Sequence, residues 1–324
     1  MFRIQQLRKN QSAPLHQGRV LLTIGAAGAA LLASTILTFP VAGAAKPAAQ
    51  STKSAATWST APTCGGVAPL GMTGSWTCTF DDEFTGTRLN TKNWVVQQTS
   101  NSGYLTGSSS AAACYVNSPQ NVSVSGGYLH LTLLKTAAPF TCSYPGGNIT
   151  TQYTAGMVST YGLFDQTYGA FEVNAKLPQS TIQGLQETFW LYPQNLTYGA
   201  WPASGEIDFA EFYSEYPNLD IPYIHYNAAA PDPAVTAYNC IINPTTFNTY
   251  GLEWSPDSLT VYYNGKVCLV DHPNPAAPLS GDAPFNQPFM IALTQAIGAG
   301  TNVFVPGITQ LPATTLVKFV RAWS

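Results

Sequence analysis

Three carboxylic acids lie within six consecutive residues, Glu206-Ile207-Asp208-Phe209-Ala210-Glu211, in a chain in which only 9% of residues are charged. The residues between them are apolar, and Phe212 follows, which favours a strand packed on a hydrophobic core. Carboxylates crowded on such a strand are costly, because each one makes the next harder to ionise. The crowding is useful where one carboxyl must be protonated and another ionised at the same pH.

Strand alternation alone does not bring the three acids together. Glu206 and Asp208 would share one face of the strand, and Glu211 would point to the other. One extra residue, a β-bulge around Phe209-Ala210, would return Glu211 to the face of Glu206. We therefore predict a bulge at this point.

A pair of carboxyl groups suits the cleavage of a glycosidic bond, and a separation of about 5–5.5 Å supports a retaining double displacement. In this interpretation Glu206 attacks the anomeric carbon, Glu211 protonates the leaving oxygen, and Asp208 holds Glu206 in place. The charge of Glu206 would favour the protonated form of Glu211. A solvated acidic edge would not explain the apolar neighbours, and calcium prefers about 6–8 oxygen ligands from a flexible loop.

Short alternating segments separated by turn residues predict an all-β fold. Gly126-Gly127 and Asn264-Gly265 each lie between two such segments and predict hairpins, and residues 315–323 also read as a strand. No useful helical periodicity follows residue 45. The pattern favours an antiparallel jelly-roll β-sandwich with a concave groove for an extended polymer.

The N-terminus has the features of a secretory signal. Basic residues precede an apolar run from Val20 to Ala44 that ends in small residues, so we interpret residues 1–44 as a signal peptide. An uncleaved membrane anchor is the alternative, because the run is long enough to span a bilayer. We expect a flexible linker at residues 45–70, a catalytic domain at residues 71–324, and a secreted protein with no integral membrane domain once the signal is cleaved.

Charge and cysteine content indicate the environment and the partner. The chain has 13 basic and 16 acidic residues, and a mildly acidic domain is a poor match for nucleic acid. We expect a neutral polysaccharide as partner and a monomeric protein.

Six cysteines behind a signal indicate disulfides, for which we choose the nearest-neighbour pairing 64–78, 114–142 and 240–268. Zinc is the weaker alternative, because the spacing lacks Cys-x-x-Cys.

Several motifs occur in the order found in glycoside hydrolase family 16, and residues 78–324 resemble its laminarinase-like branch. Besides the acidic motif, the resemblance is carried by Thr79-Phe80-Asp81-Asp82-Glu83-Phe84, Asn121-Val122, Tyr168-Gly169-Ala170-Phe171-Glu172-Val173, Phe189-Trp190-Leu191, Trp201-Pro202-Ala203-Ser204-Gly205, His225-Tyr226 and Tyr250-Gly251-Leu252-Glu253-Trp254.

The resemblance implies an endo-glycosidase in which Glu206 is the nucleophile, Asp208 its assistant and Glu211 the acid/base. Lys318 stands where the family often has a calcium-binding Asp, so we expect a metal-independent enzyme, and we expect no cofactor. The candidate sugar-binding residues are Trp190 and Trp201, which could stack on sugars, together with His225, Glu253 and Asn121.

The substrate that we expect is β-1,3-glucan. A transglycosylase that remodels a wall polymer would use the same residues. A non-catalytic glucan-binding protein usually lacks one of the three acids, all of which are present here. An agarase- or carrageenase-like enzyme is a further alternative, although sulfated carrageenan would favour a more basic chain.

Overall fold

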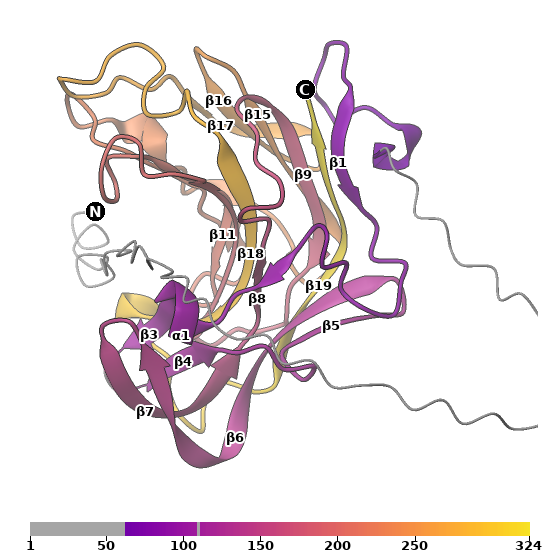
Figure 1. The fold of residues 1–324 in the computed structure, drawn as a ribbon, viewed down its shortest axis with the longest axis vertical. Coiled ribbons are helices and arrows are strands. Elements are labelled where there is room, and N and C mark those ends of the chain that lie inside the picture. Colours follow the sequence, from indigo (N-terminus) through magenta and orange to yellow (C-terminus); the bar gives the residue numbers. More distant parts are fainter. Residues whose placement is uncertain (1–61, 109–110) are drawn as a thin grey trace, which may run out of the picture. The chain divides into compact units, whose positions relative to one another are not determined.

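The computed structural model describes residues 62–108 and 111–324 (Figure 1). The expected signal peptide, residues 1–44, and the expected linker up to residue 61 lie outside the described residues.

The first sheet has eleven strands, in the order β17-β16-β15-β9-β19-β6-β7-β4-β3, with β1 added to β19 and β5 added to β6. Its pairs are antiparallel except for β4 and β7, which are parallel. The strands are β1 (Cys78–Asp82), β3 (Leu105–Ser108), β4 (Ala111–Tyr115), β5 (Val122–Ser125), β6 (Tyr128–Tyr144), β7 (Gly147–Ala155), β9 (Gly169–Lys176), β15 (Asn248–Trp254), β16 (Leu259–Tyr263), β17 (Lys266–Asp271) and β19 (Ala313–Trp323).

The second sheet has eight strands, in the order β14-β12-β11-β10-β18-β8-β2, with β13 added to β11. All of its pairs are antiparallel. The strands are β2 (Val95–Val96), β8 (Met157–Ser159), β10 (Leu185–Pro193), β11 (Glu206–Tyr213), β12 (Leu219–Asp220), β13 (Tyr223–His225), β14 (Cys240–Ile241) and β18 (Phe289–Ile297).

Helical structure in the described part of the chain is limited to short turns. These are α1 (Thr99–Ser102) and the 3-10 turns η2 (Cys64–Gly66), η3 (Pro233–Val235) and η4 (Gly300–Asn302). Among the described residues, no helix has the length and apolar character that crossing a bilayer requires.

The main hydrophobic core lies between the two sheets, with β11 and β18 on one side and β9, β15 and β19 on the other (Figure 1). Inward residues of both sheets are completely buried, among them Phe171, Phe189, Phe209, Leu252 and Val317. Burial of one such side chain contributes about 1.5–3 kcal/mol relative to exposure. The predicted all-β jelly-roll sandwich is confirmed, with β5 and β6 paired at Gly126-Gly127 and β16 and β17 paired at Asn264-Gly265.

All three predicted disulfides are present: Cys64–Cys78, Cys114–Cys142 and Cys240–Cys268. The last one joins β14, at the edge of the second sheet, to β17, at the edge of the first.

The expected linker boundary at residue 70 differs from the structure. Cys64 is fully buried, and Met72 packs with it against the outer face of the first sheet. The backbone N–H of Leu70 donates to the Glu172 carboxylate. Residues 64–70 therefore belong to the folded domain, because a disulfide and buried side chains fix them there.

Candidate active site

The three clustered acids lie on β11, and the bulge predicted there is present. Along the β10–β11 ladder Phe189 pairs with Ala210, whereas the next residue, Trp190, pairs with Asp208. Phe209 is therefore the extra residue.

Both Phe209 and Ala210 point into the main core, together with Ile207 and Phe212. Opposed residues in an antiparallel ladder point to the same side. Glu211 is opposed to Thr188 and Asp208 to Trp190, two residues apart on β10, so Glu211 and Asp208 share the face that points away from the core. Glu206 lies two residues before Asp208 and points the same way.

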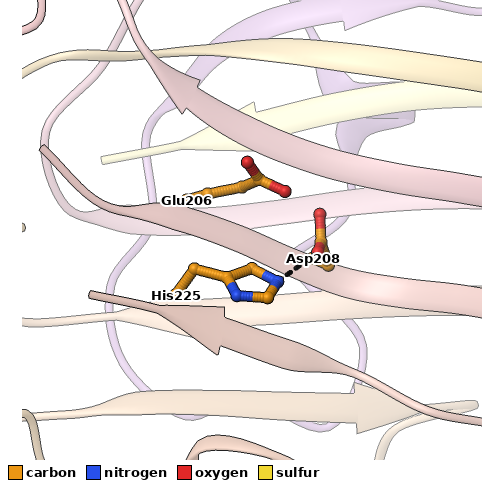
Figure 2. A group of neighbouring side chains, drawn as sticks. All are labelled: Glu206, Asp208 and His225. Atoms are coloured by element: carbon orange, nitrogen blue, oxygen red, sulfur yellow. Dashed lines mark hydrogen bonds and ion pairs between the residues drawn. The ribbon is translucent and has the colours of Figure 1, made fainter. Parts of the chain in front are cut away.

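This shared face, which we call the site face, continues onto β13. Glu206 is opposed to His225 and Asp208 to Tyr223. Nε2 of His225 lies 3.1 Å from Oδ2 of Asp208, and Figure 2 shows this contact beside the Glu206 carboxyl group. We expected His225 to bind sugar; the structure places it on the site face and pairs it with Asp208.

The acids of the site face are removed from solvent. Glu206 is 8% exposed, and Asp208 and Glu211 are each 1% exposed. A buried carboxyl must be paired or neutral, because an isolated charge is very costly away from water. Glu206, Asp208 and His225 each offer one oxygen or nitrogen atom that could bind a metal, and these three atoms lie within 4.8 Å of one another. Among the described residues, this is the group that could hold a cation.

Glu211 is held at both its side chain and its backbone. Nε2 of Gln186, on β10, donates a 2.7 Å hydrogen bond to Oε1 of Glu211. On the other side of the strand, the backbone N–H of Glu211 donates to Oδ1 of Asp220 at 2.9 Å. Gln186 therefore fixes the direction of one oxygen of the Glu211 carboxyl group.

Aromatic rings flank Glu206 on one side. The Trp190 ring packs edge-on against Tyr104, at 5.8 Å, and against Tyr192, at 5.5 Å, and its indole N–H donates to Oγ1 of Thr294 at 2.9 Å. Burial and then the charge of Glu206 raise the pKa of Tyr192. Tyr192 therefore stays neutral and can donate a hydrogen bond near Glu206.

A second row of rings lies on the β13 side. The rings of Tyr223 and His225 stack at 4.1 Å with an interplanar angle of 9°, and Trp201 lies 5.4 Å from His225. Tyr238 is 49% exposed; burial raises its pKa, and the charges of Tyr223 and Glu211 act in the same direction. The acids thus lie between two aromatic groups, an arrangement that suits the apolar faces of sugar rings.

Residues 109–310 match the sequence profile described as Glycosyl hydrolases family 16. The chain belongs to this family. Glucan endo-1,3-beta-glucosidase A1 of Niallia circulans is 29% identical over 262 residues, which are 75% of this chain and 37% of that protein. Keratan-sulfate endo-1,4-beta-galactosidase of Sphingobacterium multivorum is 33% identical over 180 residues, which are 53% of this chain and 40% of that protein. Matches to these two relatives thus span less than half of each relative's length.

The fold of this family 16 domain is shared with solved structures. The laminarinase from Rhodothermus marinus superposes with a TM-score of 0.62 at 25% identity, covering 77% of this chain and 97% of that one. The endo-1,3-beta-glucanase from Pyrococcus furiosus gives a TM-score of 0.64 at 23% identity, covering 77% and 94%.

Two of the residues that we expected to bind sugar are elsewhere in the family 16 domain. Glu253 lies on β15 of the first sheet, between the core residues Leu252 and Trp254, so its side chain points to the outer face, where it accepts a 2.8 Å hydrogen bond from Tyr262. Asn121 is 2% exposed, and its amide donates to the Thr132 carbonyl. Both expectations are corrected, because structural hydrogen bonds account for these polar groups.

Other residues of the site face were not predicted. Gln186, Tyr104 and Tyr223 reach it from β10, from the segment before β3 and from β13. The sequence contains only a weak signal for them: Tyr223 lies two residues before His225, on the same side of a strand.

Proposed function

We propose that this family 16 domain is a retaining endo-glycosidase that cleaves internal β-bonds of a polysaccharide, with β-1,3-glucan as its first candidate substrate. The observation that carries the proposal is the bulge at Phe209, which gives Glu206, Asp208 and Glu211 a common face. The name of the Niallia relative supports the choice of glucan.

The proposed reaction has two displacements. An oxygen of Glu206 attacks the anomeric carbon while Glu211 transfers its proton to the glycosidic oxygen, and the leaving chain departs with that proton. Glu211 then takes a proton from water, whose oxygen attacks the anomeric carbon and releases Glu206. Asp208, paired with His225 at 3.1 Å, orients Glu206 between these steps.

The experiment that tests this proposal is the release of reducing ends from a panel of β-1,3-glucan, mixed-linkage glucan, agarose, carrageenan and β-galactan. Proton NMR of the first product then gives the anomeric configuration. We expect a β-anomer from β-1,3-glucan and no loss of rate with a chelator. An initial α-anomer would remove Glu206 from the nucleophile role, and loss of activity with EDTA would point instead to the cation geometry of Glu206, Asp208 and His225.

A galactoside is the second candidate substrate, because a relative at 33% identity is a keratan-sulfate endo-1,4-beta-galactosidase. Activity on the galactan alone would favour it. Product lengths from a defined oligosaccharide separate hydrolysis from transglycosylation, since transfer gives products longer than the substrate.

The three disulfides support an extracellular location, because such bonds persist in oxidising compartments. Cleavage of residues 1–44 and a monomeric state stay predictions, which N-terminal sequencing and light scattering of the secreted protein would check.

A further inference from the structure

The bulge in β11 is supported from the core side by two side chains that the proposed reaction does not use. Oδ1 of Asp220, on β12, accepts the backbone N–H of Glu211 at 2.9 Å. The Tyr263 hydroxyl, on β16 of the opposite sheet, donates to the carbonyl oxygen of Phe209 at 3.3 Å. These two contacts lie on either side of Ala210, the residue that follows the extra residue Phe209.

A bulge creates the need for such contacts. The extra residue interrupts the ladder between β10 and β11 and leaves backbone groups to be satisfied in another way. In the core these groups have no access to water, and an unsatisfied one is costly. Tyr263 supplies a partner for the Phe209 carbonyl, and Asp220 supplies one for the Glu211 N–H on the β12 side of the strand.

The position of Asp220 is otherwise hard to explain. It is completely buried, and burial raises its pKa well above the ordinary range. An acid kept neutral in this way can still accept a hydrogen bond, so its burial is consistent with a role in binding the Glu211 backbone.

Asp220 and Tyr263 approach the bulge from two different sheets. Both side chains are buried, Tyr263 with 7% exposure. Two buried side chains therefore bind the backbone of β11 on either side of Ala210. We propose that Asp220 and Tyr263 form a clamp that fixes the bulge and so sets where the Glu211 carboxyl points on the site face.

This inference deepens the proposed function, since it assigns two positioning residues to the proposed acid/base. The clamp itself can be measured without any substrate. Hydrogen–deuterium exchange over the peptide that contains residues 206–213 reports how often the backbone of β11 opens.

The test compares Tyr263→Phe, which removes one hydroxyl, and Asp220→Leu, which removes the acceptor, with two matched controls. Asp220→Asn keeps an oxygen acceptor in place of the neutral acid. Tyr250→Phe removes a hydroxyl from a neighbouring core tyrosine, whose ring lies 5.7 Å from that of Tyr263.

We expect Tyr263→Phe and Asp220→Leu to raise exchange across residues 206–213 and to lower kcat on glucan on the order of tenfold with KM unchanged, because small misplacements of a reacting group are costly. The two controls should stay within about twofold of the wild type in kcat. Equal exchange in all four variants and the wild type would overturn the clamp.

Loss of thermal stability with unchanged kcat in the clamp variants would also overturn the inference, because the contacts would then be structural only. If the wild-type protein cleaves no polysaccharide of the panel, the proposed function fails, and the exchange experiment still decides whether the clamp exists.

Discussion

The amide of Gln186 and the carboxylate of Glu211 meet across two neighbouring strands, with a 2.7 Å hydrogen bond from Nε2 to Oε1. Gln186 is opposed to Tyr213 and not to Glu211 in the ladder, so its side chain reaches diagonally along the site face. This bond orients the Glu211 carboxyl group within the sheet, and the bond to Asp220 holds the Glu211 backbone.

Removing this donor should weaken catalysis by loosening the Glu211 carboxyl group. In Gln186→Leu the hydrogen bond from Nε2 is lost, and small misplacements of a reacting group are costly. We expect kcat to fall on the order of tenfold, with KM within about twofold of the wild type. Steady-state kinetics on glucan measure both constants. An unchanged kcat would contradict the positioning role of Gln186.

The two glutamates should differ in how an external nucleophile rescues them. Glu206→Gln and Glu211→Gln should each lose about a thousandfold or more of kcat, since neither the covalent step nor proton transfer has a substitute. On an activated aryl glycoside, azide should give the α-glycosyl azide with Glu206→Gln and the β-azide with Glu211→Gln. NMR of the azide products checks this, and the reverse pattern would exchange the two roles.

Trp201 and Trp190 should respond differently to substitution. Trp201 is half-buried beside the His225 ring, so Trp201→Ala should raise KM about three- to tenfold through lost stacking. Trp190 is 8% exposed and is bonded to Thr294, so Trp190→Phe should lower stability by about 1–3 kcal/mol with a smaller effect on KM. Steady-state kinetics and thermal melts separate these outcomes, and equal KM effects would place both rings in direct contact with sugar.

Glu187 should make the fold less stable at alkaline pH. It lies in the core, where burial raises its pKa to about 8 and the amide of Gln295 donates to it at 2.6 Å. Because the folded form holds the proton more tightly than the unfolded chain, its stabilising effect is complete below about pH 4.5 and is lost as the pH rises through 8.

Glu187→Gln keeps the oxygen that accepts from Gln295 and cannot ionise. We expect this variant to be more stable than the wild type at pH 9, by an amount on the order of a few kcal/mol at most, and close to it at pH 5. Thermal melts between pH 5 and 9 measure the difference. Parallel curves for the two proteins would show that Glu187 does not ionise in this range.

Local sequence rules account for the bulge and the hairpins. The bulge was predictable because Glu206 and Glu211 conflict with strand alternation, and the turn at Asn264-Gly265 requires backbone angles that those two residues adopt readily. The nearest-neighbour disulfides were also predicted, although six cysteines by themselves leave the pairing open.

Contacts between strands that are distant in sequence were not predictable in the same way. The contact between Gln186 and Glu211 depends on the order of strands in the sheet and on the register that the bulge sets. The prediction that Glu253 binds sugar was wrong because strand alternation shows which residues share a face of the sheet. It does not show which of the two faces carries the site. The positioning role that we propose for Asp220 is shared with the Tyr263 hydroxyl of the opposite sheet, and no local pattern indicates that these two residues meet the same part of β11.

The additional residue at position 209 also makes β11 tolerant of a change in length. Without Phe209, Ala210 would be the single inward residue between Asp208 and Glu211, and the third acid would still emerge beside the other two. A shortening by one residue reverses every later side chain in an ordinary strand, but here it would cost one aromatic ring of the core and keep the three acids on one face. Deletion of this one residue would therefore leave the three acids on the same side of the strand.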